Sequence, residues 1–202
     1  MKIFCIGKNY AEHAAEMGGF VPDQPMIFMK PSTALLLENK AFYYPTFTKN
    51  LHYEGEIVLK IKKNGRHIQP EFASDYYDHI AFGFDLTARD LQDECKKKGH
   101  PWEIAKAFDH SAPLGNFVSV HDYDIHNISF TTQLNGVVVQ EGNTADLIFD
   151  FNYLICYISR FFQFQTGDLI YTGTPSGVGP LKIGDVLEGF IGEKKMLSCE
   201  IK

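Results

Sequence analysis

Tyr53-Glu54-Gly55-Glu56 leads directly into Ile57-Val58-Leu59-Lys60-Ile61, a β-branched and aliphatic run that predicts a strand. Side chains alternate between the two faces of a strand, so Glu54 and Glu56 share one face and Gly55 leaves the other face bare. Two neighbouring carboxylates at the head of an apolar strand repel each other and lose hydration, and a hard divalent cation would remove that penalty. Both acids could instead lie on the solvent-exposed face of an edge strand, which is the commoner arrangement for an isolated pair.

Asp85 is the candidate third ligand. It follows the small and apolar run 80–84, which predicts a strand, and it precedes a run that predicts a helix over residues 86–98. Functional side chains are often held where a rigid element ends. The alternative is that Asp85 caps that helix, because Asp is a preferred N-cap residue. With Glu54 and Glu56, Asp85 would complete a three-carboxylate site for Mg²⁺ or Mn²⁺ with positions open for water and substrate.

One lysine, Lys106, lies among apolar neighbours in Trp102-Glu103-Ile104-Ala105-Lys106-Ala107-Phe108. Three carboxylates and a dication leave one net negative charge, so an anionic substrate would require a nearby cation such as Lys106. The alternative is a surface lysine whose aliphatic stem covers apolar neighbours.

His13 and Glu16 lie three residues apart within residues 10–17, a run that predicts a short helix, so they share a face. A carboxylate hydrogen-bonded to an imidazole fixes its tautomer and raises its basicity, which prepares a general base. The alternative is an exposed polar pair. Gly18-Gly19 would allow a segment of about residues 10–20 to move as a lid.

A glycine-punctuated loop, Thr172-Gly173-Thr174-Pro175-Ser176-Gly177-Val178-Gly179-Pro180, follows a predicted strand. Its glycines let the backbone approach a ligand closely, and it offers N–H and hydroxyl donors. It lacks the G-K-[ST] ending of a phosphate-binding loop, so nucleotide binding is not expected. The alternative is a tight turn without a ligand.

Composition indicates a soluble protein of one domain. The chain has 202 residues, of which 45% are hydrophobic and 22% charged, and this fits a sizeable single core. A net charge of −6 argues against a nucleic-acid binder and against docking on anionic membranes. The four cysteines are scattered without a C-x-x-C pair, which favours reduced thiols. We find no signal-peptide pattern and no uninterrupted apolar span, and we expect a cytoplasmic protein.

Short apolar runs separated by turn residues predict a strand-rich α+β fold over residues 1–202. The clearest hairpin joins residues 128–134 to 137–140 through Asn135-Gly136. Helical spacing of apolar residues predicts a buried helix over 148–162, and residues 71–77 are weakly helical. Further strands are expected at residues 2–6, 26–30, 35–37, 42–44, 169–172, 186–188 and 196–201.

Several stretches together resemble the fumarylacetoacetate hydrolase family, and specifically its short members in the acylpyruvate hydrolase and oxaloacetate-handling branch. They span nearly the whole chain and occur in the family's order. They are Gly7-Lys8-Asn9-Tyr10-Ala11-Glu12-His13, Phe28-Met29-Lys30-Pro31-Ser32, Tyr53-Glu54-Gly55-Glu56, Asp85-Leu86-Thr87-Ala88-Arg89-Asp90-Leu91-Gln92, Pro101-Trp102 with Lys106, Gln140-Glu141-Gly142-Asn143-Thr144 and the loop 172–180.

The resemblance implies a mixed β-sandwich roll of the fumarylacetoacetate hydrolase C-terminal domain type, expected to be a homodimer. It implies Mg²⁺ or Mn²⁺ bound by the three carboxylates and a water-activating dyad on a closing lid. The implied site residues are Glu54, Glu56 and Asp85 for the metal, His13 and Glu16 for the dyad, and Gln92, Lys106 and Thr174 facing the substrate. Lys8 stands where many relatives carry Arg, and Ala145-Asp146-Leu147 replaces a more usual Ser/Met-containing run.

The resulting hypothesis is a hydrolase that cleaves a carbon–carbon bond of 2,4-dioxo acids (acylpyruvates) to pyruvate and a carboxylic acid. His13, oriented by Glu16, would take a proton from water, and Lys106 would stabilise the oxyanion at carbon 4. The alternatives are an oxaloacetate tautomerase or decarboxylase and a 2-hydroxyhepta-2,4-diene-1,7-dioate isomerase or decarboxylase, which need enolate stabilisation without an attacking water. A non-catalytic metal-binding protein would require none of His13, Glu16 and Lys106.

Overall fold

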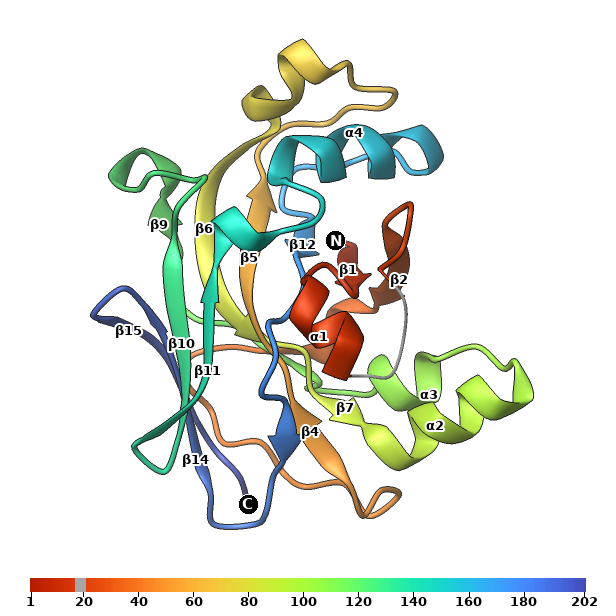
Figure 1. Ribbon diagram of the computed structural model, residues 1–202, viewed down its shortest axis with the longest axis vertical. Coiled ribbons are helices and arrows are strands. Elements are labelled where there is room, and N and C mark those ends of the chain that lie inside the picture. Colours follow the sequence, from red (N-terminus) through yellow and green to blue (C-terminus); the bar gives the residue numbers. More distant parts are fainter. Residues whose placement is uncertain (17–20) are drawn as a thin grey trace.

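The computed structural model describes residues 1–16 and 21–202, and a mixed six-stranded sheet forms its centre. From edge to edge its strands are β2 (Met26–Lys30), β1 (Ile3–Gly7), β12 (Leu169–Tyr171), β5 (Gly55–Ile61), β6 (Tyr77–Phe84) and β9 (Val118–Ser119). The pairing of β1 with β12 is parallel, and the other neighbours are antiparallel. Figure 1 shows β5 and β6 as the long strands of this sheet.

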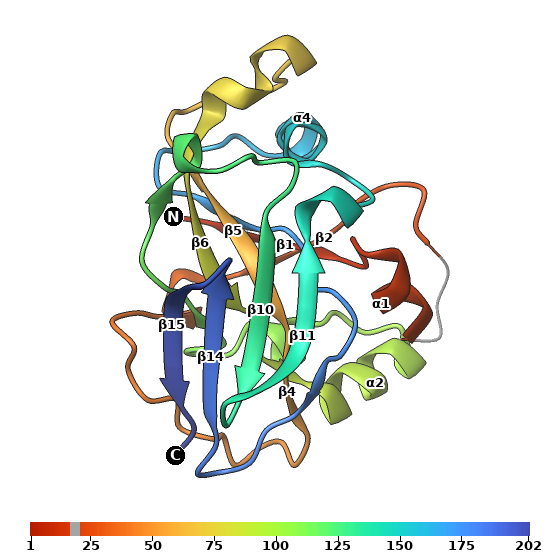
Figure 2. The ribbon, with the colours of Figure 1, turned by 60° about the vertical axis from the view of Figure 1, so that its left-hand side comes forward.

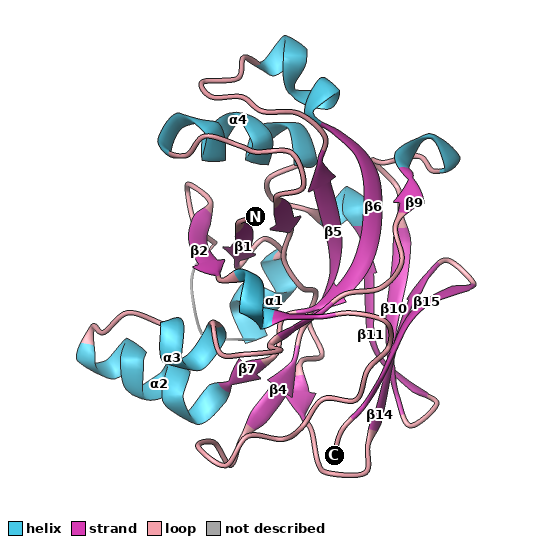
Figure 3. Cartoon of the chain, turned by 180° about the vertical axis from the view of Figure 1, so that it is seen from behind, coloured by secondary structure: helices cyan, strands magenta, loops and turns pink. Residues whose placement is uncertain are grey.

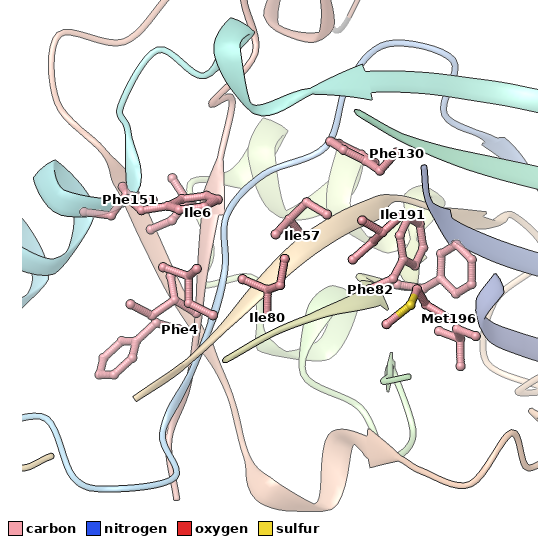
Figure 4. Packing of buried hydrophobic residues seen from close by; sticks show 14 of the residues in the cluster. Phe4, Ile6, Ile57, Ile80, Phe82, Phe130, Phe151, Ile191 and Met196 are labelled. Carbon is pink, nitrogen blue, oxygen red and sulfur yellow. The ribbon is translucent and has the colours of Figure 1, made fainter. Parts of the chain in front are cut away.

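A second, antiparallel sheet lies against one face of the first (Figure 2). Its strands are β11 (Val137–Asn143), β10 (Ser129–Leu134), β14 (Val186–Ile191) and β15 (Lys194–Glu200). Aromatic and aliphatic side chains from both sheets fill the space between them (Figure 4). The rings of Phe82 on β6 and Phe130 on β10 lie 6.1 Å apart. This packing confirms a strand-rich α+β fold built on two facing sheets.

Shorter elements surround these sheets. Two small sheets are formed by β13 (Gly179–Pro180), β4 (Leu51–Tyr53) and β7 (Thr87–Ala88), and by β3 (Leu35–Leu36) with β8 (Ala112–Pro113). The helices are α1 (Ala11–Glu16), α2 (Arg89–Lys98), α3 (Glu103–Lys106) and α4 (Phe151–Phe161). Short 3-10 helices cover Ser32–Ala34, Pro70–Tyr76, Val120–Asp122 and Thr144–Asp146. Seen from behind in Figure 3, α1, α2, α3 and β7 gather at one side of the central sheet.

Most predicted elements are present, with shifted ends. The expected helix over 148–162 begins at Phe151, because the Asp150 side chain accepts a hydrogen bond from the Tyr153 N–H at 2.8 Å and caps it. The strand expected at 42–44 is wrong, since this segment forms only an isolated bridge between Phe42 and Ile201. None of the helices in the described part of the chain is long and apolar enough to cross a membrane.

The helix expected over 86–98 begins at Arg89. Leu86 instead donates its N–H to the carbonyl of Ser111 at 2.9 Å, and β7 pairs with β4 before the helix begins. Ala88 therefore occupies the N-cap position of α2, and the alternative role of Asp85 as a helix cap is wrong. The helix ends at Gly99, whose φ of 66° is the left-handed conformation that glycine adopts at no steric cost.

Candidate active site

The pairing of β5 with β6 brings the three predicted acids together. Glu56 pairs with Gly83, so Glu54, just before β5, lies opposite Asp85, just after β6. The Asp85 N–H donates to the Glu54 carbonyl at 2.8 Å and extends the pairing by one step. Because alternate residues share a face, all three carboxylates project from the same side of the sheet. One oxygen atom of each lies within 4.8 Å of the others, and all three residues are buried.

Gly55 allows this end of β5 to approach the second sheet. Its N–H donates to Gln140 Oε1 at 3.0 Å. A Cβ atom at this position would lie 2.2 Å from Thr132 Oγ1 and 2.9 Å from Phe82 Cζ, closer than such atoms can approach. The face opposite the acids is therefore not bare, as the sequence predicted, but covered by residues of β10 and β11.

The three carboxylates differ in their electrostatic surroundings. Burial raises the pKa of Glu56 well above its usual range, and the charges of Asp85 and Glu54 raise it further. Burial would also raise the pKa of Glu54, but the positive charges of Lys106 and Arg89 outweigh that effect and hold it below its usual range. An unneutralised carboxylate beside two others is costly in this buried position, so the arrangement favours a bound cation.

Buried cations surround the acids. Lys106 Nζ donates to Glu54 Oε2 and to Asp85 Oδ2, each at 2.7 Å. The Arg89 guanidinium donates to Glu54 Oε1 at 2.6 Å, and Lys30 Nζ lies 2.8 Å from Asp85 Oδ1. Burial would lower the pKa of Lys106, but the charges of Asp85 and Glu54 raise it instead. The alternative of Lys106 as a surface lysine is wrong, because its side chain is only 4% exposed.

Lys30 and Arg89 are site residues for which the sequence predicted no role. Lys30 ends an apolar strand, and its ammonium also donates to the Ser111 side chain at 2.9 Å and to the Lys106 carbonyl. The sequence contains a signal for each residue. Lys30 is a lone cation at the end of an apolar strand, and Arg89 lies three residues before Gln92, on the same face of a helix. The three cations balance the three carboxylates, so a bound dication would make the site net positive rather than net negative.

His13 and Glu16 lie on α1 and contact each other, with Nδ1 of the histidine 3.2 Å from Oε2 of the glutamate. His13 is buried and lines the same cavity as the three acids, whereas Glu16 is exposed. Glu16 also accepts a hydrogen bond from the Gly177 N–H at 3.1 Å, which ties α1 to the loop 172–180. The predicted hinge glycines, Gly18 and Gly19, lie outside the described residues.

The loop 172–180 contacts β5 directly. The Gly173 N–H donates to Glu56 Oε2 at 2.7 Å, and the Thr174 hydroxyl donates to the Gly55 carbonyl at 2.9 Å. Gly173 has a φ of 108°, and a Cβ there would lie 2.7 Å from Cβ of Asn9. This position therefore requires glycine. The loop is more than a tight turn, because its backbone orients one of the three carboxylates.

A cavity of about 40 Å³ lies over the acids. All eight predicted site residues except Glu16 line it, together with Lys8, Arg89 and Lys96. Gln92 is held there by Arg89, whose Nη1 donates to the Gln92 side-chain oxygen at 2.5 Å. The structure thus brings the predicted metal and substrate residues and His13 to one cavity, and Glu16 contacts His13 without lining it.

The donor set suits a divalent cation. Three carboxylates are the oxygen ligands that Mg²⁺ and Mn²⁺ prefer. Among the described residues, Asp85 Oδ1 is a buried oxygen that accepts no hydrogen bond, although it lies within ion-pair distance of Lys30. Each ionised carboxylate offers about four lone-pair sites, so the contacts to Lys106 and Arg89 do not exhaust Glu54.

Known proteins match this chain over nearly its whole length. The family model described as fumarylacetoacetate (FAA) hydrolase C-terminal matches residues 2–200. The mitochondrial oxaloacetate tautomerase FAHD1 of Bos taurus is 43% identical over 99% of this chain and 90% of its own length. The oxaloacetate tautomerase YcgM of Escherichia coli is 41% identical over 92% of this chain and 86% of its own length.

Among solved structures, fumarylpyruvate hydrolase from Pseudomonas aeruginosa in complex with Mn²⁺ and pyruvate is similar over the whole chain. It superimposes with a TM-score of 0.94 at 37% identity and covers 100% of this chain and 89% of its own. Sequence, fold and the buried carboxylate triad lead to one conclusion: this chain belongs to the fumarylacetoacetate hydrolase family, whose named relatives here are enzymes.

Proposed function

We propose that this protein is a divalent-metal-dependent oxaloacetate tautomerase, which interconverts the keto and enol forms of that acid. The observation that carries the proposal is the small cavity over three buried carboxylates, ringed by Lys8, Arg89, Lys96 and Lys106. Oxaloacetate is a dianion, and a site that becomes net positive on binding a dication attracts it. The two oxaloacetate tautomerases, at 43% and 41% identity, support the same substrate.

Glu54, Glu56 and Asp85 are the residues that would bind Mg²⁺ or Mn²⁺. When bound, such an ion supplies a Lewis acid that withdraws electrons from the 2-oxo group and acidifies the protons on carbon 3. The P. aeruginosa neighbour, solved in complex with Mn²⁺, supports a divalent ion in a protein of this fold. Arg89, Gln92 and Lys106 would bind the carboxylate groups of the substrate, and Thr174 lines the same cavity.

His13 is the candidate proton carrier. Tautomerisation moves one proton from carbon 3 to the 2-oxo oxygen, and the reverse step returns it. Glu16 contacts Nδ1 of His13 at 3.2 Å, which leaves Nε2 to exchange this proton. No water molecule is consumed, so the reaction requires the His13–Glu16 pair as an acid and base but not as a water-activating dyad.

Acylpyruvate hydrolysis, the activity favoured by the sequence, is the second candidate. The observation that favours it is a larger cavity next to the first one. Oxaloacetate would leave this larger cavity unfilled, whereas the acyl group of an acylpyruvate could occupy it. In this reaction His13 takes a proton from water, and the hydroxide attacks carbon 4 near Lys106. The bond between carbons 3 and 4 then breaks, releasing a carboxylic acid and the enolate of pyruvate, which is protonated. The fumarylpyruvate hydrolase neighbour supports this chemistry in the same fold.

We propose a cytoplasmic enzyme that acts as a homodimer on a small 2-oxo acid. Gel filtration with light scattering checks the second part, with twice the chain mass of 22.9 kDa as the expected result.

Two assays on one enzyme preparation separate the candidates. The first follows loss of enol oxaloacetate by its absorbance, and the second follows pyruvate released from acetylpyruvate and from oxaloacetate. Rapid enol loss with little pyruvate supports the tautomerase. Pyruvate from acetylpyruvate at a comparable rate would favour the hydrolase, and pyruvate from oxaloacetate would favour a decarboxylase. Substitution His13→Ala should abolish whichever activity is found.

A further inference from the structure

A second cavity, of about 290 Å³, lies beside the carboxylate cavity, between β2 and the segment 100–106. Met26, Phe28, Trp102 and Lys106 line both cavities, so the two lie next to each other. We call the larger one the Trp102 cavity. A molecule held at the acids and extending past Lys106 enters it.

The walls of the Trp102 cavity are mostly apolar. Of the nine described residues that line it, six are apolar: Met26, Ile27, Phe28, Met29, Pro101 and Trp102. The rings of Phe28 and Trp102, which line both cavities, lie 6.0 Å apart. An apolar cavity of about 150 Å³ already admits benzene, so the Trp102 cavity has room for a phenyl ring or a branched alkyl chain.

We propose that the Trp102 cavity binds an uncharged apolar group carried on carbon 4 of a 2-oxo acid and sets the preference among longer substrates. This inference rests on the proposed function, because the oxo-acid end has to be held at the carboxylate triad. Lys106 belongs to both cavities, and its ammonium lies 2.7 Å from Glu54 and Asp85, so carbon 4 of such an acid would lie next to it.

Charge argues against an acidic group in the same place. Glu103 lines the cavity, and its carboxylate would repel a terminal carboxylate on the substrate. Flexible methionine side chains, in contrast, adapt to apolar groups of different shape. The cavity therefore favours alkyl and aryl groups over groups that end in a second acid.

Trp102 provides a direct readout, since it is the only tryptophan in the chain. The protein, loaded with Mg²⁺ or Mn²⁺, is titrated with pyruvate, 2-oxopentanoate, 2-oxo-4-phenylbutanoate and 2-oxopentanedioate. We expect affinity to rise about fourfold for each buried methylene, so 2-oxopentanoate should bind on the order of 10-fold more tightly than pyruvate. The phenyl acid should bind most tightly and shift the Trp102 emission, and the diacid should show neither effect.

Two truncations test the wall itself. Met29→Ala removes a lining side chain, and we expect it to lower the affinity ratio of 2-oxo-4-phenylbutanoate to pyruvate at least fivefold. Ile104→Ala is the matched control on the same helix as Lys106, because Ile104 is 62% exposed and lines neither cavity. The control should leave the ratio at the wild-type value, and thermal melting checks that both variants are folded.

The outcomes separate this inference from the proposed function. Equal affinities for all monoacids, with Trp102 emission unchanged, would overturn the binding role of the Trp102 cavity, even if the protein turns over oxaloacetate. Graded affinities without oxaloacetate turnover would support the cavity and overturn the tautomerase. Failure of all four acids to bind would overturn both.

Discussion

At the scale of single residues, the site is a balanced cluster of buried charges. Lys30, Lys106 and Arg89 hold Asp85 and Glu54 in ion pairs of 2.6–2.8 Å. Glu56 differs, because it accepts a backbone hydrogen bond from Gly173 and its pKa is raised by burial. The cluster therefore has one carboxylate that most requires an added cation.

The first prediction concerns that carboxylate. Glu56→Gln keeps the shape of the side chain but removes its charge. Mutating a residue that only supports a metal ligand weakens metal binding by up to about 100-fold, so we expect the loss of a ligand to weaken Mn²⁺ binding by at least that factor. Titration calorimetry measures the affinity. Glu193→Gln, at an exposed turn position, is the matched control and should bind like the wild type. Unchanged Mn²⁺ affinity in Glu56→Gln would remove this residue from the metal site.

The second prediction concerns Lys30. Lys30→Met leaves Asp85 buried without one of its cations, and breaking such a pair typically costs about 3–5 kcal/mol of the free energy of unfolding. Chemical denaturation measures the loss. Lys40→Met removes an exposed ion pair with Glu38 at 3.0 Å and should cost less than about 1 kcal/mol. Adding Asp85→Asn to Lys30→Met should recover stability, and a double variant no more stable than the single one would contradict this explanation.

At the scale of elements, two strands determine the site. The register of β5 against β6 places Glu54 opposite Asp85, and the packing of Gly55 against β10 fixes the position of β5 relative to the second sheet.

Helix α4 covers the far end of β6, where Tyr77 packs edge-on against Phe151 with ring centroids 6.1 Å apart.

Gly55→Ala tests the close approach of the two sheets. The added methyl group would lie 2.2 Å from Thr132 Oγ1, so β5 has to shift, and we expect a loss of about 1–3 kcal/mol in the free energy of unfolding. Gly7→Ala is the control for stability, since its Cβ would meet nothing closer than 3.8 Å. Thr132→Ala in the Gly55→Ala background should restore part of the loss. Equal stability of the Gly55→Ala and Gly7→Ala proteins would contradict the packing argument.

Alkaline pH tests the contact between β6 and α4. Burial, with a smaller effect from Asp150, raises the pKa of Tyr77 to about 12, and its hydroxyl donates to Asn152 at 3.0 Å. The folded state therefore keeps a proton that the unfolded chain loses from about pH 10, so this contribution to stability is complete below pH 10 and is lost as pH rises towards 12. In urea denaturation, Tyr77→Phe should be less stable than the wild type at pH 8, and the difference should shrink between pH 10 and 12. A difference that does not change with pH would contradict the raised pKa.

At the scale of the whole molecule, the sequence predicted what depends on local pattern. Alternation along residues 53–61 placed Glu54 and Glu56 on one face, and the Asn135-Gly136 turn identified the hairpin of β10 and β11. The same alternation predicted a bare opposite face at Gly55. That prediction is wrong, because a second sheet, built from residues far along the chain, covers this face. Local propensity likewise favoured Asp85 as a helix cap, and tertiary pairing of β7 with β4 overrode it.

The cations of the site show the limit of sequence reasoning most clearly. Lys106 was predicted as a cation near the acids, but its direct bonds to Glu54 and Asp85 depend on α3 packing against β7. Lys30 reaches Asp85 from a strand 55 positions earlier in the chain, and no local pattern carries that information. With Lys30, Arg89 and Lys106 beside the three acids, the site would carry a net positive charge once a dication is bound, and this favours a dianionic substrate.

Metal-dependent tautomerase activity is best tested by the rate of enol oxaloacetate loss with one protein sample before and after chelation. We predict that protein loaded with Mg²⁺ or Mn²⁺ accelerates the loss well above the rate in buffer. The chelator should return it to the buffer rate, and added metal should restore the acceleration. Acceleration that persists in the chelator, or loaded protein that does not exceed buffer, would contradict a metal-dependent tautomerase at Glu54, Glu56 and Asp85.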